Sequence, residues 1–151
     1  MRQITIRPAE TSDQYALEAL QWRASLNNAG DRDELLANSD AIELPLQQIE
    51  SGGVFIAEEL GAVMGFAAIL PRSDGDAELD ALFVEPETWR QGVGRALVEH
   101  CCVAAKGCAA KAIHVVGNPY AEGFYEACGF KQVGRKQMRF GVGLLMQRSL
   151  Q

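Results

Sequence analysis

Apolar residues recur along this chain in two patterns, one typical of strands and the other of helices. Alternating or short continuous apolar runs predict strands at residues 3–7, 54–58, 63–70, 78–84, 112–116, 131–137 and 142–150. Apolar residues at helical spacing predict helices at residues 15–26, 92–106 and 121–127. Between residues 31 and 48 we expect a short second helix, a loop and one further turn after Pro45.

The order of these elements predicts an α/β fold (α+β mixed). They follow one another as strand, helices, three strands, helix, strand, helix and two strands. Neighbouring hairpins combined with helical crossovers indicate a mixed sheet with helices on both faces. The 151 residues, of which 48% are hydrophobic, fit one domain over residues 1–151.

Composition argues against several classes of protein. The net charge is −6 and no Lys/Arg cluster is present, so neither nucleic acid nor an anionic membrane surface is an expected partner. The four cysteines form no C-x-x-C pair and the two histidines stand at no zinc spacing, so no metal is expected. No apolar stretch suits a signal peptide or a membrane span, which favours a reducing cytoplasm with free thiols.

The most informative segment follows a predicted strand and opens a predicted helix: Trp89-Arg90-Gln91-Gly92-Val93-Gly94-Arg95-Ala96-Leu97. The first amides of a helix have no internal partner, and glycines let a ligand approach them closely. Arg90 and Arg95 add positive charge, so the segment predicts a phosphate or pyrophosphate site, against the alternative of a tight turn with good helix packing. Arg95-Ala96 replaces the Lys-Ser/Thr of a P-loop, and Leu97 stands where a dinucleotide-binding motif has its third glycine.

Two segments together resemble the acyl-CoA signatures of the GNAT acetyltransferases. The first is Val84-x-Pro86 followed by Gly92-x-Gly94, and the second is Asn118-x-x-Ala121-x-x-Phe124-Tyr125-x-x-x-Gly129-Phe130. The resemblance implies a single GNAT-like domain with a central mixed, mostly antiparallel sheet of six to seven strands, splayed where acyl-CoA binds. One departure is Trp89, which stands where the family usually has Gln or Arg.

The resemblance also implies that acetyl-CoA is the co-substrate and that no metal takes part. Main-chain groups of the strand before the turn would hold the pantetheine arm, and the amides of the turn would hold the pyrophosphate. The residues implied to contact acetyl-CoA are Leu82, Phe83, Val84, Arg90, Gln91, Gly92, Val93, Gly94, Arg95, Ala96, Asn118, Phe124 and Tyr125.

Catalytic roles follow from the same resemblance. A lysine-like amine is mostly protonated at neutral pH, so its acetylation needs a base. Glu78 is the first candidate and Asp80, on the same face of the strand, is the second; the alternative is a solvated or salt-bridged strand face. Tyr125 matches the tyrosine that assists the leaving thiolate, against the alternative of a half-buried core residue. Asn118 either contacts the cofactor arm or forms an Asx-turn.

The activity implied is direct transfer of an acetyl group to a primary amine of a small molecule or amino-acid-like metabolite, by a monomer or homodimer. Two alternatives stay open: a protein lysine or N-terminal acetyltransferase, and a non-catalytic acyl-CoA-binding regulatory module. We expect the loops at 27–45 and 138–141 to decide the acceptor, and we interpret His114 as a satisfied core histidine. Five acidic residues either steer a cationic amine or form a solvated face, namely Asp31, Asp33, Glu34, Asp40 and Glu43.

Overall fold

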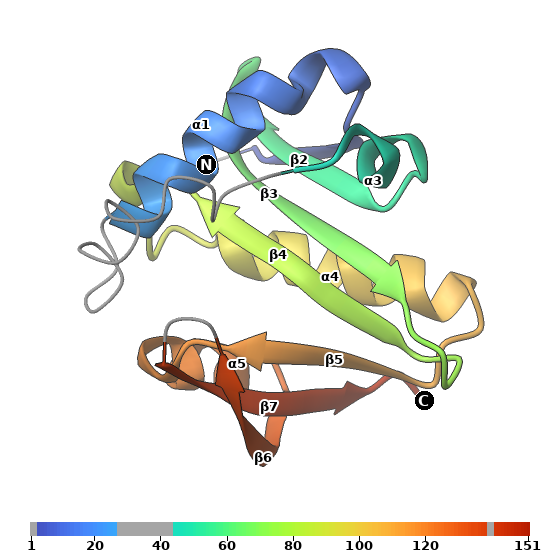
Figure 1. Cartoon of the computed structure of the whole chain (residues 1–151). Helices are drawn as coiled ribbons and strands as arrows, with labels where there is room; N and C mark the ends of the chain where they lie inside the picture. The colour runs from blue at the N-terminus through green and yellow to red at the C-terminus, as the bar shows by residue number, and fades with distance from the viewer. Residues whose placement is uncertain (1–2, 27–43, 139–140) are drawn as a thin grey trace. The chain divides into compact units, whose positions relative to one another are not determined.

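A computed structural model describes residues 3–26, 44–138 and 141–151 of the chain (Figure 1). Its strands are β1 (Thr5–Pro8), β2 (Val54–Glu59), β3 (Ala62–Pro71), β4 (Ala77–Val84), β5 (Ala112–Gly117), β6 (Lys131–Met138) and β7 (Gly141–Ser149). Its α-helices are α1 (Gln14–Leu26), α3 (Leu46–Glu50), α4 (Val93–Gly107) and α5 (Glu122–Ala127). Short 3-10 helices are η1 (Thr11–Asp13), η3 (Pro86–Thr88) and η4 (Pro119–Ala121). The order of elements is the one that the sequence predicts.

The described strands form one hydrogen-bonded series in the order β1-β2-β3-β4-β5-β7-β6. β2 pairs antiparallel with β1 and with β3, and β7 pairs antiparallel with β5 and with β6. β4 and β5 are parallel. The prediction of a mixed, mostly antiparallel sheet is confirmed, with seven strands in the part of the chain that the structure describes.

The chain divides into two compact units. The first contains Met1–Ala68 and Ala81–Leu97, and the second contains Ile69–Asp80 and Val98–Gln151. The division crosses β3, β4 and α4, so each of these elements contributes residues to both units. The expectation of one domain over residues 1–151 stays a prediction.

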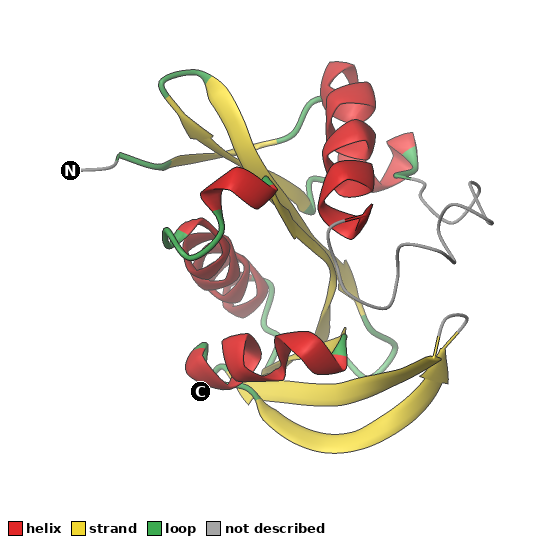
Figure 2. Cartoon of the chain, turned by 90° about the vertical axis from the view of Figure 1, so that its left-hand side faces the viewer, coloured by secondary structure: helices red, strands yellow, loops and turns green. Residues whose placement is uncertain are grey.

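The first unit buries apolar side chains between α1 and the strands beside it. Leu17 and Leu20 of α1, Ile56 of β2 and Phe66 of β3 are fully buried in one cluster. α1 lies alongside β2 and β3 in Figure 1 and, turned by 90°, in Figure 2. The ring of Phe83 lies 5.6 Å from that of Phe66, which ties the last residues of β4 to this cluster.

The second unit buries one face of α4 and alternate residues of β5. Val98, Cys101 and Cys102 of α4 are all buried. Ile113 and Val115 of β5 are also buried, while the residues between them are only partly so. Because side chains of a strand alternate in direction, His114 lies on the opposite face from these two residues.

Most predicted elements begin and end within two residues of the observed ones. The turn expected after Pro45 is present as α3, whereas the second helix expected within residues 31–43 lies outside the described residues. At the start of the first helical segment, the backbone N–H of Glu10 donates to the Asp13 carboxylate at 2.8 Å. None of the described helices is both long and apolar enough to cross a membrane.

β4 and β5 pair over a short register. Ala77 lies opposite Ile113 and Glu78 lies opposite His114, and all four residues belong to the second unit. The register ends at that point, although each strand continues for several more residues. The splay of the two strands where acyl-CoA binds stays a prediction.

Candidate active site

The first unit carries the glycine-rich turn, and the end of β4 that leads into it is held from two sides. The backbone N–H of Glu85 donates to the Met64 carbonyl of β3 at 2.8 Å. The carboxylate of Glu85 is ion-paired with Arg23 of α1. The hydroxyl of buried Thr88 donates to the Glu85 carbonyl at 2.9 Å and closes η3. The strand end that precedes the turn is therefore fixed in position.

The backbone of the turn is shaped for the close approach of a ligand. Arg90 and Gly92 both have positive φ, 66° and 88°, a conformation that glycine adopts far more readily than other residues. A Cβ added at Gly92 would meet no atom within 4 Å, so the space beside it is open. α4 begins at Val93, and the amides of 93–95 precede the first helical bond, from the Ala96 amide to the Gly92 carbonyl at 3.0 Å. These amides are available to an anion.

The side chains of the turn differ in what they can offer. Arg90 and Arg95 are exposed, so both can bring positive charge to a bound phosphate. The side-chain amide of exposed Gln91 donates to the Glu87 carbonyl at 3.2 Å. Val93 is buried, so only its backbone amide can reach a ligand.

Trp89 makes a contact that the sequence did not predict. Its indole N–H donates to the Val84 carbonyl at 2.8 Å, and the residue remains 41% exposed. One of the main-chain groups expected to meet the pantetheine arm therefore already has a partner. The sequence marks Trp89 as a departure from the family. The hydrogen bond from its indole to Val84, five residues earlier, depends on the geometry of η3.

The second unit carries Tyr125 on α5. The side chain is 8% exposed, and burial raises the pKa of its hydroxyl to about 12. Its ring packs edge-on against Phe124 at 5.3 Å and against Phe130 at 5.6 Å. A Cβ added at Gly117 would lie 3.1 Å from the ring of Tyr125, so the absence of a side chain at Gly117 makes room for the ring.

Asn118 forms the turn that joins β5 to η4. Its side-chain oxygen accepts the backbone N–H of Tyr120 at 2.8 Å, which is the Asx-turn that the sequence allows. The structural role of Asn118 is therefore observed, and its contact with a cofactor stays a prediction. Phe124, the other predicted cofactor contact here, is 37% exposed.

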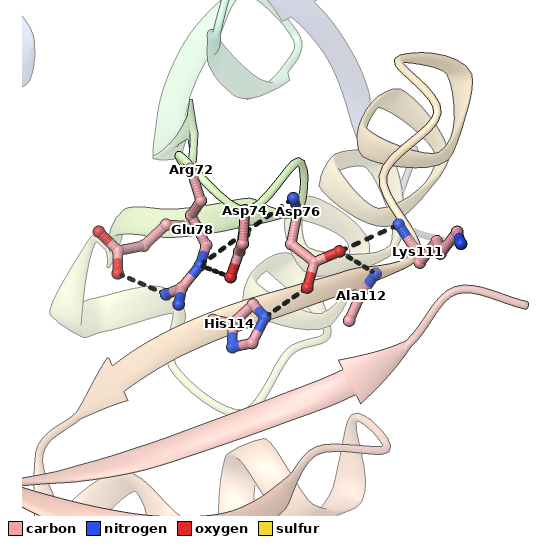
Figure 3. A network of polar contacts seen from close by, with 7 residues as sticks. All are labelled: Arg72, Asp74, Asp76, Glu78, Lys111, Ala112 and His114. Atoms are coloured by element: carbon pink, nitrogen blue, oxygen red, sulfur yellow. Dashed lines mark hydrogen bonds and ion pairs between the residues drawn. The ribbon is translucent and has the colours of Figure 1, made fainter.

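A polar network surrounds the start of β4 in the second unit (Figure 3). One oxygen of Asp76 accepts the backbone N–H groups of Lys111 and Ala112 at 3.3 and 3.2 Å. The other oxygen contacts Nε2 of His114 at 2.9 Å. The hydrogen bond from His114, followed by those from the two backbone amides, lowers the pKa of Asp76.

Glu78 and Asp80, the predicted bases, lie on the same side of β4 as this network. An Arg72 nitrogen lies 3.6 Å from a Glu78 oxygen, and the same guanidinium contacts Asp74 at 3.2 Å. The salt-bridged strand face considered as the alternative for Glu78 is thus present, although the side chain remains 34% exposed. Asp80 is exposed.

The structure divides the predicted site residues between the two units. The main-chain groups of β4 expected to hold the pantetheine and the whole glycine-rich turn belong to the first unit. The second unit contains Glu78, Asp80, Asn118, Phe124 and Tyr125. The acidic cluster at residues 31–43 lies outside the described residues. Sequence reasoning missed Asp76 and took His114 as a core residue, yet the alternation of acidic residues at 74, 76, 78 and 80 was a readable signal.

Comparison with known proteins covers both units. The family model described as "Acetyltransferase (GNAT) family" matches residues 15–130, well over half of the chain. Two curated proteins named peptidyl-lysine N-acetyltransferase YjaB, from Salmonella typhimurium and Escherichia coli, are each 40% identical over 60 residues. That match spans 40% of this chain and 40% of each relative, so it reaches less than half of their length.

Solved structures share the fold over nearly the whole chain. A GCN5-related N-acetyltransferase from Rhodopseudomonas palustris has a TM-score of 0.82 at 21% identity, covering 99% of this chain and 98% of its own. The protein yncA from Salmonella typhimurium, solved with its cofactor acetyl-CoA, has a TM-score of 0.72 at 25% identity, covering 99% and 95%. Both are similar to this chain in the arrangement of their elements.

Proposed function

The chain belongs to the GNAT family of acetyltransferases, and from that premise we propose that it transfers the acetyl group of acetyl-CoA directly to a primary amine of a small molecule. The observation that carries the proposal is the open turn at the start of α4. Gly92 has a φ of 88° there, and the amides of residues 93–95 that follow it have no helical partner. As a member of this family the chain is an acyltransferase. Its proposed compartment is the cytoplasm, since all four cysteines are free thiols.

The residues present fit the cofactor. The amides of 93–95 would hold the pyrophosphate, and exposed Arg90 and Arg95 would add charge to it. Main-chain groups of Leu82 and Phe83 would bind the pantetheine amides as a neighbouring strand does, because Trp89 already occupies the Val84 carbonyl. Acetyl-CoA supplies an activated thioester carbonyl when bound.

Two side chains would move or hold protons. Glu78 would take the proton from the ammonium group of the acceptor, directly or through one water. Tyr125 would donate a hydrogen bond to the sulfur on which negative charge develops. The pKa of the Tyr125 hydroxyl is about 12, whereas the pKa of a free thiol is about 8.5. Full proton transfer from Tyr125 to the thiolate would therefore be uphill by about 5 kcal/mol. Tyr125 therefore acts as a hydrogen-bond donor, and the proton that finally reaches the thiol comes from solvent.

A thiol-release assay tests the proposal. Purified protein with acetyl-CoA is offered a panel of small primary amines, amino acids and lysine-containing peptides, and free thiol is measured alongside the acetylated product by mass spectrometry. We expect release that depends on one class of amine. Binding of coenzyme A by calorimetry without release against any acceptor would support the non-catalytic alternative, and absence of binding would refute the cofactor site.

Peptidyl lysine is the second candidate acceptor. It is supported by the similarity of 60 residues to two proteins named peptidyl-lysine N-acetyltransferases. Free lysine and a lysine-containing peptide carry the same side-chain amine, so the same assay separates the two candidates. A peptide acetylated at least tenfold faster than any free amine would favour the protein substrate.

A further inference from the structure

His114 is held in a defined orientation by an ionised carboxylate. Asp76 contacts Nε2 of the ring at 2.9 Å, and two backbone amides fix the other oxygen of the same carboxylate. An ionised carboxylate only accepts hydrogen bonds, so Nε2 carries the proton that it donates to Asp76. In the neutral ring, Nδ1 then has the free lone pair. Figure 3 shows that this second ring nitrogen points away from Asp76.

His114 lies on the strand position directly opposite Glu78, the residue proposed as the base. Glu78 of β4 and His114 of β5 are directly opposite in the parallel register, and residues paired in this way project to the same face. His114 is 18% exposed at its side chain, so solvent reaches it. The Glu78 carboxylate contacts Arg72, whereas none of the described residues forms a hydrogen bond with Nδ1 of His114.

We propose that His114, oriented by Asp76, is a second proton-accepting group of the acetyl transfer, working beside Glu78. The proposal rests on the proposed function, because it assigns a base to the same reaction. An imidazole is in general a stronger base than a carboxylate, so it is the better acceptor of a proton from an ammonium group. General bases work best when their basicity approaches the operating pH.

The proposed step is balanced in protons and electrons. The acceptor ammonium gives one proton to Nδ1 of His114, directly or through a water, and Asp76 stabilises the imidazolium that forms. The neutral amine nitrogen then attacks the acetyl carbonyl, so that a C–N bond forms and the C–S bond breaks with its electron pair on sulfur. The attacking nitrogen, which is positively charged once the C–N bond forms, loses a second proton to solvent as the amide forms. The departing thiolate takes up one proton from solvent, and the imidazolium returns the first proton to solvent.

The charges around the ring suit this role. From the loop before β4, Asp74 and Asp76 have carboxylate oxygens within 4.8 Å of the ring nitrogen. From β4, Glu78 adds a third carboxylate, while Arg72 is engaged by Asp74 and Glu78. From β7, the residue paired with His114 is Gln147, which carries no charge.

Matched variants separate this role from a structural one. His114→Gln keeps an amide that can donate to Asp76 but removes the titrating base. Asp76→Asn keeps an oxygen that accepts the two backbone amides. Its side-chain NH2 group would donate to the ring, so that Nε2 becomes the acceptor. His100→Gln changes the only other histidine of the chain and serves as the control.

We expect both site variants to lower kcat about a hundredfold and to leave the affinity for coenzyme A, measured by calorimetry, unchanged. The acidic limb of the pH profile of kcat/KM should differ from that of the wild type in His114→Gln. In His100→Gln this limb should match that of the wild type. Added imidazole should restore part of the activity of His114→Ala. A His114→Gln enzyme within twofold of the wild type, with the same pH profile, would overturn the proposal and assign the base to Glu78 alone.

A measurement without turnover keeps the inference separate from the proposed function. The nitrogen spectrum of ¹⁵N-labelled histidine in the unliganded protein reports which ring nitrogen carries the proton. We expect His114 to be the Nε2–H tautomer in the wild type and to lose that preference in Asp76→Asn. An Nδ1–H tautomer in the wild type would contradict the inference even if acetyl transfer is observed, whereas failure of the thiol-release assay alone would refute the proposed function.

Discussion

The neighbours of Tyr125 fix the position of its ring and the protonation state of its hydroxyl. Two aromatic rings pack against it edge-on, and Gly117 leaves the space that its ring fills. Burial keeps its hydroxyl protonated, with a pKa of about 12. A hydroxyl that stays protonated can donate a hydrogen bond at any pH at which an amine is acetylated, so burial here serves the proposed chemistry.

The first prediction concerns removal of this hydroxyl. Tyr125→Phe should lower kcat about tenfold to a hundredfold, because a hydrogen bond to a charged group contributes about 1.5–3 kcal/mol. The ring and its packing remain, so the affinity for coenzyme A measured by calorimetry should not change. Tyr120→Phe, at an exposed tyrosine, is the control and should retain full turnover. Wild-type turnover in Tyr125→Phe with a good acceptor would remove the proposed role.

At the scale of elements, the turn between β4 and α4 combines an open surface with a rigid support. At the β4 end of the turn, the side chains of Thr88 and Trp89 donate hydrogen bonds to the carbonyls of Glu85 and Val84. Gly65 lets β3 approach the end of β4 closely, since a Cβ added at Gly65 would lie 2.8 Å from the Phe83 carbonyl. The turn can therefore present its amides without rearranging when a ligand binds, which reduces the entropic cost of binding.

The second prediction tests the backbone of this turn. Gly92→Ala places a Cβ on a residue with φ of 88°, a strain of about 1–2 kcal/mol that is relieved when the amides rotate away. We expect the Kd for coenzyme A to rise about tenfold. Gly52→Ala is the matched control, because Gly52 has φ of 84° and an equally open Cβ position. It should lose similar stability by thermal unfolding and keep the wild-type Kd.

How far the sequence predicts these elements depends on how local the cause is. The turn and α5 are readable, because glycine spacing and the Phe124-Tyr125 pair act over a few residues. The contact between Asp76 and His114 joins residues 38 positions apart, so it requires the register of β4 against β5. Sequence alone therefore treated His114 as a core residue. The bond from Trp89 to Val84 is close in sequence, but it depends on the curvature of η3, which no periodicity encodes.

At the scale of the whole molecule, buried titrating groups link stability to pH. Burial raises the pKa of Tyr125 from 10.0 to about 12 and that of Cys101 from 9.0 to about 12. In the folded chain both groups keep their protons to higher pH than in the unfolded chain. As the pH rises from about 9 to 12 the unfolded chain loses protons first, and the free energy of unfolding falls.

The third prediction follows from this linkage. Between pH 9 and 12 the free energy of unfolding should fall by about 3 kcal/mol through Tyr125 alone, and further through Cys101. Thermal unfolding midpoints measured at successive pH values should fall less steeply in Tyr125→Phe and in Cys101→Ala than in the wild type. Cys108→Ala, at an exposed cysteine, should keep the wild-type slope. If all four proteins lost stability in parallel, the alkaline transition would have to arise from groups other than Tyr125 and Cys101. Such a result would also contradict the burial of the Tyr125 hydroxyl, which supports its role as a hydrogen-bond donor.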